Sequence, residues 1–331
     1  MSTVPNAFGT ALGTSAPAVG FGAFTTPNGS FVQPGGRVAA YVRSTGAQDL
    51  DDLFVRENLV LTINEGLKRC RSGLGDVVYV LPGHVENIDA ADDWPDLVAG
   101  TQIVGCGRPG ASNNPTLTWT ATASTVLLNV ANVSVIGLTM NWAGIDNVAA
   151  PITVSAAGCA MLGNHIVVQS AAASAGAVQG VDVGVAGSGF RFVGNRCVSD
   201  DEGEPLTGGG VVMVSGAAND VVVSNNYISG AAANTVGLII VSAAATNITV
   251  SNNWLYNLET TSGDACIVIG NVAATGIVCN NYNKFMTAGD PNAADLGIFY
   301  GAAATTIGSF ENYSVDDTFL QAVLAEPHPG T

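Results

Sequence analysis

One pattern returns along most of this chain at a nearly constant spacing. The stretch DVVVSNNYIS covers residues 220–229, and NITVSNNWLY covers residues 247–256. In both stretches apolar residues alternate with polar ones, and two asparagines follow the alternation. Self-similarity with a period of about 20 to 50 residues is typical of a solenoid or a propeller. The repeat therefore limits the possible folds more than any other feature of the sequence.

The pattern aligns over a long part of the chain on the position of its second asparagine. That position holds Cys106, Leu138, Asn164, Asn195, Asn226, Asn253 and Asn281, in steps of 32, 26, 31, 31, 27 and 28 residues. The residues three and five positions earlier are mostly apolar in every segment. Because side chains of a strand alternate between its two faces, both columns are predicted to point inward.

The residue before the aligned position is always glycine or asparagine. The column reads Gly105, Gly137, Gly163, Gly194, Asn225, Asn252 and Asn280. Both residue types tolerate a left-handed backbone, so the column predicts a bend with positive φ. The asparagines at the aligned position itself are expected to stack from coil to coil, with their side-chain amides forming a hydrogen-bonded ladder. We interpret both columns as structural.

A second group of short strands precedes the bends by about 12 to 16 residues. These strands begin at Pro151, Gly180, Gly210, Gly237, Cys266 and Gly297, and small or turn-forming residues separate them from the bends. A coil of about 29 residues without helices favours a parallel β-helix over a propeller, whose blades need about 40 to 45 residues. We therefore predict an all-β chain, a single-stranded parallel β-helix (β-solenoid) of about seven to eight coils.

The two ends differ from the repeat, as solenoid ends must when they cover the core. We divide the chain into an extended N-terminal arm (1–47), a capping helix with the first strands (48–97), the parallel β-helix (98–315) and a C-terminal cap and tail (316–331). The helix is predicted at about Leu59–Arg71 and the first strand at Val77–Leu81. The repeat pattern weakens after residue 300.

The arm is rich in Gly, Ala, Ser, Thr and Pro and carries no charge before Arg37. One interpretation is a disordered tail. The other is an arm that becomes ordered on a partner, with aromatic side chains as anchors. The candidate partner-binding residues are then Phe8, Phe21, Phe24 and Phe31.

Charge and composition argue against several classes of protein. Ten basic residues stand against 26 acidic ones, a net charge of −16, so binding to nucleic acid is not expected. No apolar run is long enough to span a bilayer, and the first residues lack the features of a signal peptide, so we expect no membrane association. The six cysteines form no CxxC pair and are interpreted as small buried hydrophobic residues.

The sequence TINEGLKRCRSGLGDVVYVLPGHVENI, followed by coils of the VxVSNNxI type, resembles the pectin-lyase-like superfamily of right-handed parallel β-helices. The resemblance covers about residues 57–315 and is strongest to structural proteins of tailed bacteriophages. It implies a right-handed β-helix. Some members of the superfamily are polysaccharide lyases or tailspikes that cut glycans, and others are non-enzymatic virion proteins, typically homotrimers.

Catalytic residues are not evident in the sequence. The coils offer few basic side chains and no lyase constellation, and the acidic loop of Asp200, Asp201, Glu202 and Glu204 is interpreted as a solvated turn, with a calcium loop or a catalytic pair as alternatives. His84, His165 and His328 are expected to be isolated surface residues. The coil surface is expected to lack the aromatic side chains that grip a long glycan. No cofactor or metal is expected.

The resemblance and the missing catalytic residues together predict a non-enzymatic virion protein. It would be a homotrimeric capsid decoration or cement protein that binds the major capsid protein, made in the host cytoplasm and located on the capsid surface. The alternative is a short tailspike or tail fibre that binds or cleaves a host glycan, and a bacterial surface adhesin is a third interpretation.

Overall fold

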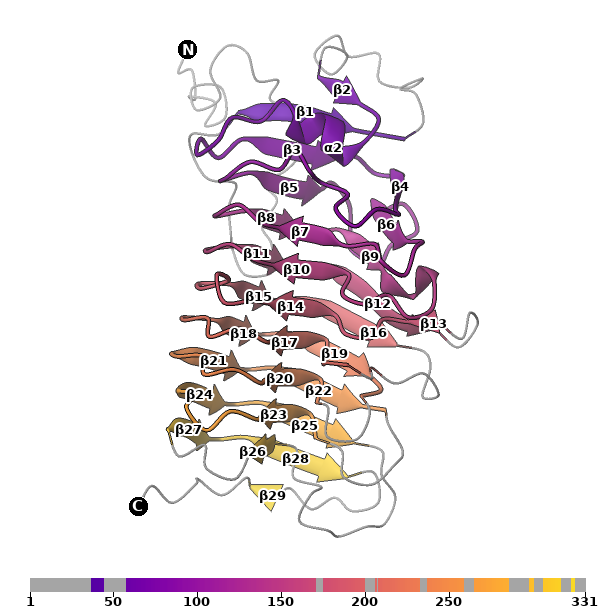
Figure 1. Cartoon of the computed structure of the whole chain (residues 1–331). Coiled ribbons are helices and arrows are strands. Elements are labelled where there is room, and N and C mark those ends of the chain that lie inside the picture. The colour runs from indigo at the N-terminus through magenta and orange to yellow at the C-terminus, as the bar shows by residue number, and fades with distance from the viewer. Residues whose placement is uncertain are drawn as a thin grey trace, which may run out of the picture.

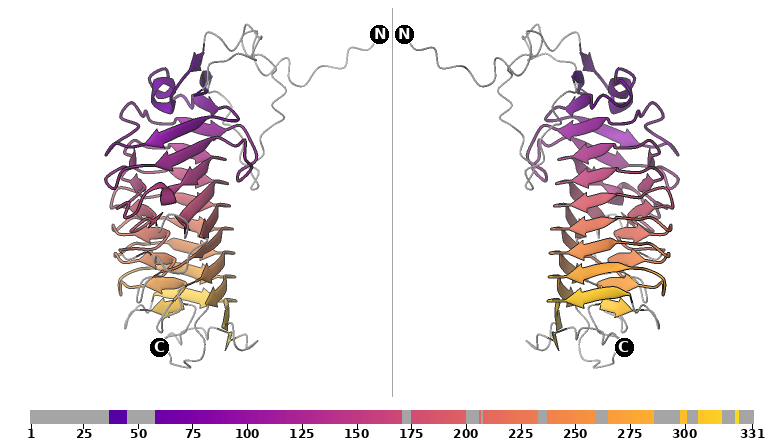
Figure 2. Two further views of the ribbon diagram at one scale, coloured as in Figure 1. Left: turned by 90° about the vertical axis from the view of Figure 1, so that its right-hand side faces the viewer. Right: turned by 90° about the vertical axis from the view of Figure 1, so that its left-hand side faces the viewer.

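The computed structural model describes residues 37–44, 58–170, 175–199, 206, 208–232, 237–258, 265–285, 298–300, 306–316 and 323–324. These residues form a column of short parallel strands, stacked like rungs and arranged in three sheets (Figures 1 and 2). The chain is a parallel β-solenoid of about seven turns, consistent with the pectin-lyase-like fold. Each full turn contributes one strand to each sheet, whereas the sequence pattern predicted two strands per turn.

The first sheet contains the strands that lead into the predicted bends. Its order is β2 (Leu59–Val60), β1 (Val38–Val42), β3 (Val77–Val80), β5 (Gln102–Gly105), β8 (Ser134–Ile136), β11 (Ala160–Leu162), β15 (Arg191–Val193), β18 (Val222–Ser224), β21 (Ile248–Ser251), β24 (Gly276–Cys279) and β27 (Ile307–Phe310). The register pairs Met161 with Phe192 and Phe192 with Val223, as in the sequence alignment.

The second sheet contains the second strand group of the sequence, with one additional strand at its start. Its members are β7 (Val126–Leu128), β10 (Ile152–Val154), β14 (Val181–Val183), β17 (Val212–Val214), β20 (Ile239–Val241), β23 (Ile267–Ile269) and β26 (Ile298–Tyr300). All the pairs in this sheet are parallel.

The third sheet follows the ladder asparagines and was not predicted. It contains β4 (Val85–Ile88), β6 (Thr116–Trp119), β9 (Thr139–Asn141), β12 (His165–Ser170), β16 (Arg196–Ser199), β19 (Tyr227–Gly230), β22 (Trp254–Asn257), β25 (Tyr282–Phe285), β28 (Tyr313–Asp316), β29 (Val323–Leu324) and β13 (Ala175–Gly176). The last two pair antiparallel with their neighbours. A short 3-10 helix, η1 (Trp142–Gly144), follows β9.

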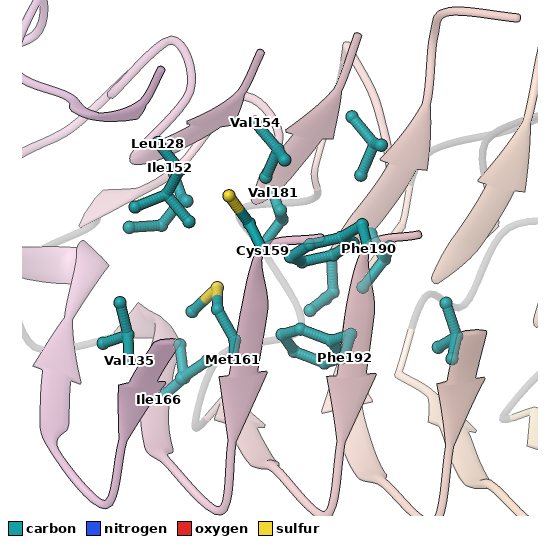
Figure 3. Packing of buried hydrophobic residues seen from close by; sticks show 14 of the residues in the cluster. Leu128, Val135, Ile152, Val154, Cys159, Met161, Ile166, Val181, Phe190 and Phe192 are labelled. Carbon is teal, nitrogen blue, oxygen red and sulfur yellow. The ribbon is translucent and has the colours of Figure 1, made fainter. Parts of the chain in front are cut away.

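The core runs along the axis of the column and consists of inward side chains from all three sheets. The two predicted inward columns of the first sheet are confirmed, because Met161, Phe190 and Phe192 are fully buried together with their equivalents in neighbouring coils. Figure 3 shows how these side chains meet Ile152 and Val181 of the second sheet. Apolar side chains of one coil thus pack on those of the next, which makes each coil depend on its neighbours.

Left-handed residues form the bends between the first and third sheets. Gly137, Gly163 and Gly194 and then Asn225, Asn252 and Asn280 all have φ between 55° and 67°. The expectation was wrong for Gly105, which lies inside β5; a Cβ there would clash with the carbonyl of Gly137, so glycine is needed for close approach. A second left-handed column, missed in the sequence, lies two residues before the first-sheet register positions: Gly75, Gly100, Asn132, Gly158, Gly189, Asp220 and Asn247.

The buried asparagines after these bends are joined by a continuous series of hydrogen bonds. The backbone N–H and the side-chain Nδ2 of Asn195 both donate to Oδ1 of Asn226, at 2.9 and 3.2 Å. The same Nδ2 also donates to the carbonyl of Met161 at 3.0 Å. The arrangement repeats at Asn164, Asn226, Asn253 and Asn281, and it ends on Asn312, one coil beyond the aligned repeat. We call this series the asparagine ladder.

The N-terminal end of the core is covered by the helix α2 (Ile63–Leu67). Thr62 and Glu65 form a capping box, and Ile63, Gly66 and Leu67 are buried. Gly66 lies against Val78, since a Cβ at this position would be 2.9 Å from Val78 Cγ1. The helix is shorter than predicted, because Leu59–Val60 pairs with β1 as strand β2 instead.

Strand β1 lies within the segment that the sequence analysis placed in the arm. Residues Val38–Val42 pair in parallel with both β2 and β3. Strand β3 is therefore not the first strand of the sheet. Its inward residues Ala40 and Val42 are fully buried and extend the core by one level. Phe8, Phe21, Phe24 and Phe31 lie outside the described residues.

The buried carboxylate of Asp76 joins several segments at the N-terminal end of the column. Asp76 is fully buried and accepts hydrogen bonds from Arg71 Nη2 at 2.7 Å, from Arg71 Nε at 2.9 Å and from the backbone N–H groups of Arg71 and Arg37. These donors stabilise the charged form, so the Arg71 guanidinium above all holds the pKa of Asp76 well below its usual range. The same contact raises the pKa of Arg71.

The ladder should be sensitive to loss of a single side chain. We expect Asn226→Ala to lower the free energy of unfolding by about 2 to 4 kcal/mol, because it removes the acceptor of two buried donors of Asn195 and leaves the Phe192 carbonyl without its donor. Urea denaturation followed by circular dichroism measures this. The control is Asn225→Gly at the preceding bend, which keeps the left-handed backbone and should change stability by less than about 1 kcal/mol. Equal losses in both variants would contradict the ladder's role.

Replacing Asp76 should make stability respond differently to pH. Since its folded-state pKa lies below the unfolded value of about 3.9, the carboxylate stabilises the fold above that pH, and the contribution is lost as pH falls from about 4 toward the folded-state pKa. We expect Asp76→Asn to cost about 1 to 3 kcal/mol at pH 7 and less below pH 4. Thermal melts of both proteins from pH 3 to pH 7 measure this difference, and a constant gap would contradict it.

Candidate functional site: an aromatic row on the third sheet

Four aromatic side chains line the outer face of the third sheet in consecutive coils. Tyr227, Trp254, Tyr282 and Tyr313 begin β19, β22, β25 and β28, and the parallel register pairs each with the next. These strands lie one below another in the orange and yellow part of the column (Figure 1). We call these four residues the aromatic row.

The asparagine ladder sets the position of the row. Each member of the row directly follows a ladder asparagine, for example Trp254 after Asn253. The asparagine is buried, with 2% of its surface exposed, so the next side chain of the strand points to the opposite face. The residue after that, Leu255, is again buried in the core.

Contacts along the sheet order the rings of the row. The ring centroids of Trp254 and Tyr282 are 4.5 Å apart, with an angle of 40° between the ring planes. At the N-terminal end of the row, Arg196 pairs with Tyr227 and its Cζ lies 4.7 Å from the Tyr227 ring centroid. Contacts of both kinds stabilise neighbouring strands.

A second outward position on the same sheet carries a similar pair. Tyr256 lies two residues after Trp254 and pairs with Lys284 of the next coil. The Lys284 Nζ atom is 4.8 Å from the Tyr256 ring centroid. The face therefore combines aromatic rings with two of the few basic side chains of the coils.

The row is exposed at two of its four positions. Trp254 is 53% exposed and Tyr313 is 45% exposed, Tyr227 and Tyr282 are half-buried, and Trp94, Trp119 and Trp142 are buried in the core. Single exposed aromatic side chains are ordinary on protein surfaces. Several exposed aromatic side chains next to one another form a patch, and such patches are typical of binding surfaces. The expectation that the coil surface lacks such groups was wrong. The signal was present in the repeat itself, as the triplets NNY, NNW, NNY and ENY.

A different aromatic pair lies at the N-terminal end of the first sheet but is not exposed in the same way. The rings of Tyr41 and Tyr79 stack with centroids 5.8 Å apart, and Leu81 and Cys106 pack beside them. Burial raises the pKa of Tyr79 to about 12 and that of Tyr41 above its usual value. This group is a separate, largely buried cluster on the opposite face of the first sheet from the inward residues Ala40 and Val42.

The histidines occupy two different environments. His84 is fully buried, contrary to expectation, and its Nε2 lies 2.8 Å from Glu86 Oε2. The same oxygen accepts the backbone N–H of Ile63 at the start of α2, so the pair helps to hold the helix on β4. His165 is half-buried, and its pKa is lowered by burial and by the charge of Arg196. His328 lies outside the described residues.

The remaining sequence candidates either lie outside the described residues or stand apart from one another within them. The acidic loop from Asp200 to Glu204 lies outside the described residues. Among the residues that the structure describes, no three His, Cys, Asp or Glu side chains are placed to hold a metal ion. Cys159, Cys197, Cys106 and Cys266 are buried as expected, while Cys70 and Cys279 are only partly buried.

Comparison with known proteins gives no match: no family model, no curated protein and no solved structure is significantly similar to the chain. In the described part of the chain, no helix is long and apolar enough to cross a membrane. The geometry of the aromatic row is consequently the main evidence on function.

Fluorescence quenching can test the exposure of the row. Three of the four tryptophans are buried, so we expect acrylamide to quench a distinct fraction of the emission that comes from Trp254. Trp254→Phe should remove this fraction and keep the ring contact with Tyr282. Stern–Volmer plots of both proteins measure it. Equal quenching of the two would show that Trp254 is shielded in the protein.

Proposed function

We propose that this protein is a non-enzymatic structural component of a tailed-bacteriophage virion, of the capsid decoration or cement type. In this proposal it is a right-handed, pectin-lyase-like β-helix that forms homotrimers and binds the major capsid protein on the capsid surface. The observation that carries the proposal is the combination of a column braced by buried hydrogen bonds with an exposed aromatic row.

The column is suited to stabilising a capsid because the amide groups of the ladder asparagines form hydrogen bonds between neighbouring coils. The ladder side chains are buried and donate to backbone carbonyls of the preceding coil and to the next asparagine. Such a solenoid transmits load along its axis through hydrogen bonds and packed side chains. A protein that stabilises a shell needs many weak contacts repeated by symmetry, and a rigid element can present them at fixed positions.

A glycan-binding tailspike or tail fibre is the second candidate function, and the aromatic row is the observation that favours it. Rings in a row on a solenoid can follow an extended polymer. Sugars, however, bind by lying on a free ring face. Arg196 covers one face of Tyr227, and Trp254 and Tyr282 cover each other in part, which weighs against this alternative.

Binding to undecorated capsids tests the proposal directly. We expect the purified full chain to co-sediment with such capsids saturably. If the arm is the anchor, changing Phe8, Phe21, Phe24 and Phe31 to Ala should abolish binding. This variant keeps strand β1, whereas a deletion of residues 1–47 would remove it. A matched control changes the exposed Val185 and Val272 to Ala. Absence of saturable binding by the full chain would contradict the proposal, and a glycan array would then test the alternative.

A further inference from the structure

We propose that the aromatic row is the surface through which one copy of this chain binds a second copy. This inference deepens the proposed function and rests on it, since it names the contact that would hold the homotrimer together. The partner follows from three properties of the row: the covering of its ring faces, the residue types, and the charge around them.

Several ring faces on this surface are partly covered by neighbouring side chains. One face of Tyr227 is occupied by Arg196, and the rings of Trp254 and Tyr282 stand only 4.5 Å apart. Lys284 covers Tyr256 in the neighbouring column in the same way. The result is an aromatic ridge along the column whose ring faces are partly covered, and it packs against a protein surface better than it receives a sugar ring.

The residue types of the ridge are those that dominate the binding energy of protein interfaces. Tyr, Trp and Arg are enriched at the centres of such interfaces, where large rigid side chains bury much area at little entropic cost. Trp254 is the most exposed member and lies in the middle, with Arg196 and Tyr227 before it and Tyr282 and Tyr313 after it. A central tryptophan flanked by tyrosines is a suitable anchor.

The charge of the chain indicates where the ridge would bind on the other copy. Two copies that each carry a net charge of −16 repel at long range, so the contact needs a local pairing of the basic groups Arg196 and Lys284 with an acidic group of the other copy. Asp220 is exposed at the left-handed bend before β18, in the same coil as Tyr227. When two columns stand side by side at equal height, this carboxylate lies about one coil spacing, roughly 5 Å along the axis, from the level of Arg196.

This contact is heterologous, because the ridge of one copy meets a different face of the next. Heterologous contacts form closed rings when the rotation between copies closes. A ring of three parallel columns uses every ridge and every bend once. A heterologous contact of this kind is compatible with the homotrimer of the proposed function.

The test is the mass of the full chain in solution, measured by size-exclusion chromatography with light scattering. We expect the native protein to elute as a trimer of the 33.4 kDa chain. Trp254→Ala combined with Tyr282→Ala should raise the dissociation constant at least tenfold and give monomer at the same concentration. Arg196→Glu should weaken the trimer as well. Circular dichroism melts establish that each variant is folded.

A matched control uses an exposed aromatic residue of another face. Phe310 is 46% exposed on the outer face of the first sheet, and Phe310→Ala should leave the trimer intact. A native protein that is monomeric at all concentrations overturns the inference, as does a folded double variant whose mass equals that of the native protein.

The mass measurement and the capsid co-sedimentation test the contact and the proposed function separately. A trimer that depends on Trp254 but does not co-sediment with capsids supports the contact and overturns the capsid proposal. A monomer that binds capsids overturns the contact and supports the capsid proposal. A monomer that binds a glycan through Trp254 overturns the inference and favours the tailspike alternative.

Discussion

The asparagine ladder is the interaction on which the rest of the structure depends. A left-handed residue turns the chain out of the first sheet, and the next residue turns its carboxamide inward, where it hydrogen-bonds to the coils before and after it. Burying an amide without partners would be costly, so the stacking of identical coils is what makes these asparagines tolerable in the core. The ladder in turn fixes the register of neighbouring coils, because an offset of one residue would leave every amide unpaired.

The same register produces the candidate site. Once each asparagine points inward, the side chain that follows must point outward and must lie above its equivalent in the next coil. Tyr227, Trp254 and Tyr282 therefore form a row without any loop to position them. The row on the surface and the ladder in the interior therefore follow from the same register. A binding surface made in this way is rigid, so little entropy is lost when a partner docks.

The two ends of the column solve a different problem. A coil at either end exposes apolar side chains and strand edges that the interior coils satisfy mutually. At the N-terminal end, α2 covers the inward residues Val78 and Ala40, and Asp76 with its arginine partners binds the loop after the helix to the start of β3. The contacts of Arg37 with Asp76 and with Arg69 join segments 39 and 32 residues apart in sequence, whereas Arg71 lies only five residues before Asp76. They follow no repeat, and each is specific to that end.

The sequence by itself determined the parallel coil, its inward columns and the residues of the ladder, because these depend on local alternation and on a repeat that any alignment of the chain reveals. It did not determine the third sheet, whose strands vary in length and carry polar core positions such as Asn283. It also did not reveal that His84 is buried against Glu86 or that Val38–Val42 joins the sheet. The triplets NNY, NNW, NNY and ENY place an aromatic residue after each ladder asparagine, but the face that these residues share follows from the register of the third sheet. Only the tertiary structure decided these points, because burial and adjacency between coils arise from stacking segments about 30 residues apart, and no local pattern records which faces of the stacked chain stay open to solvent.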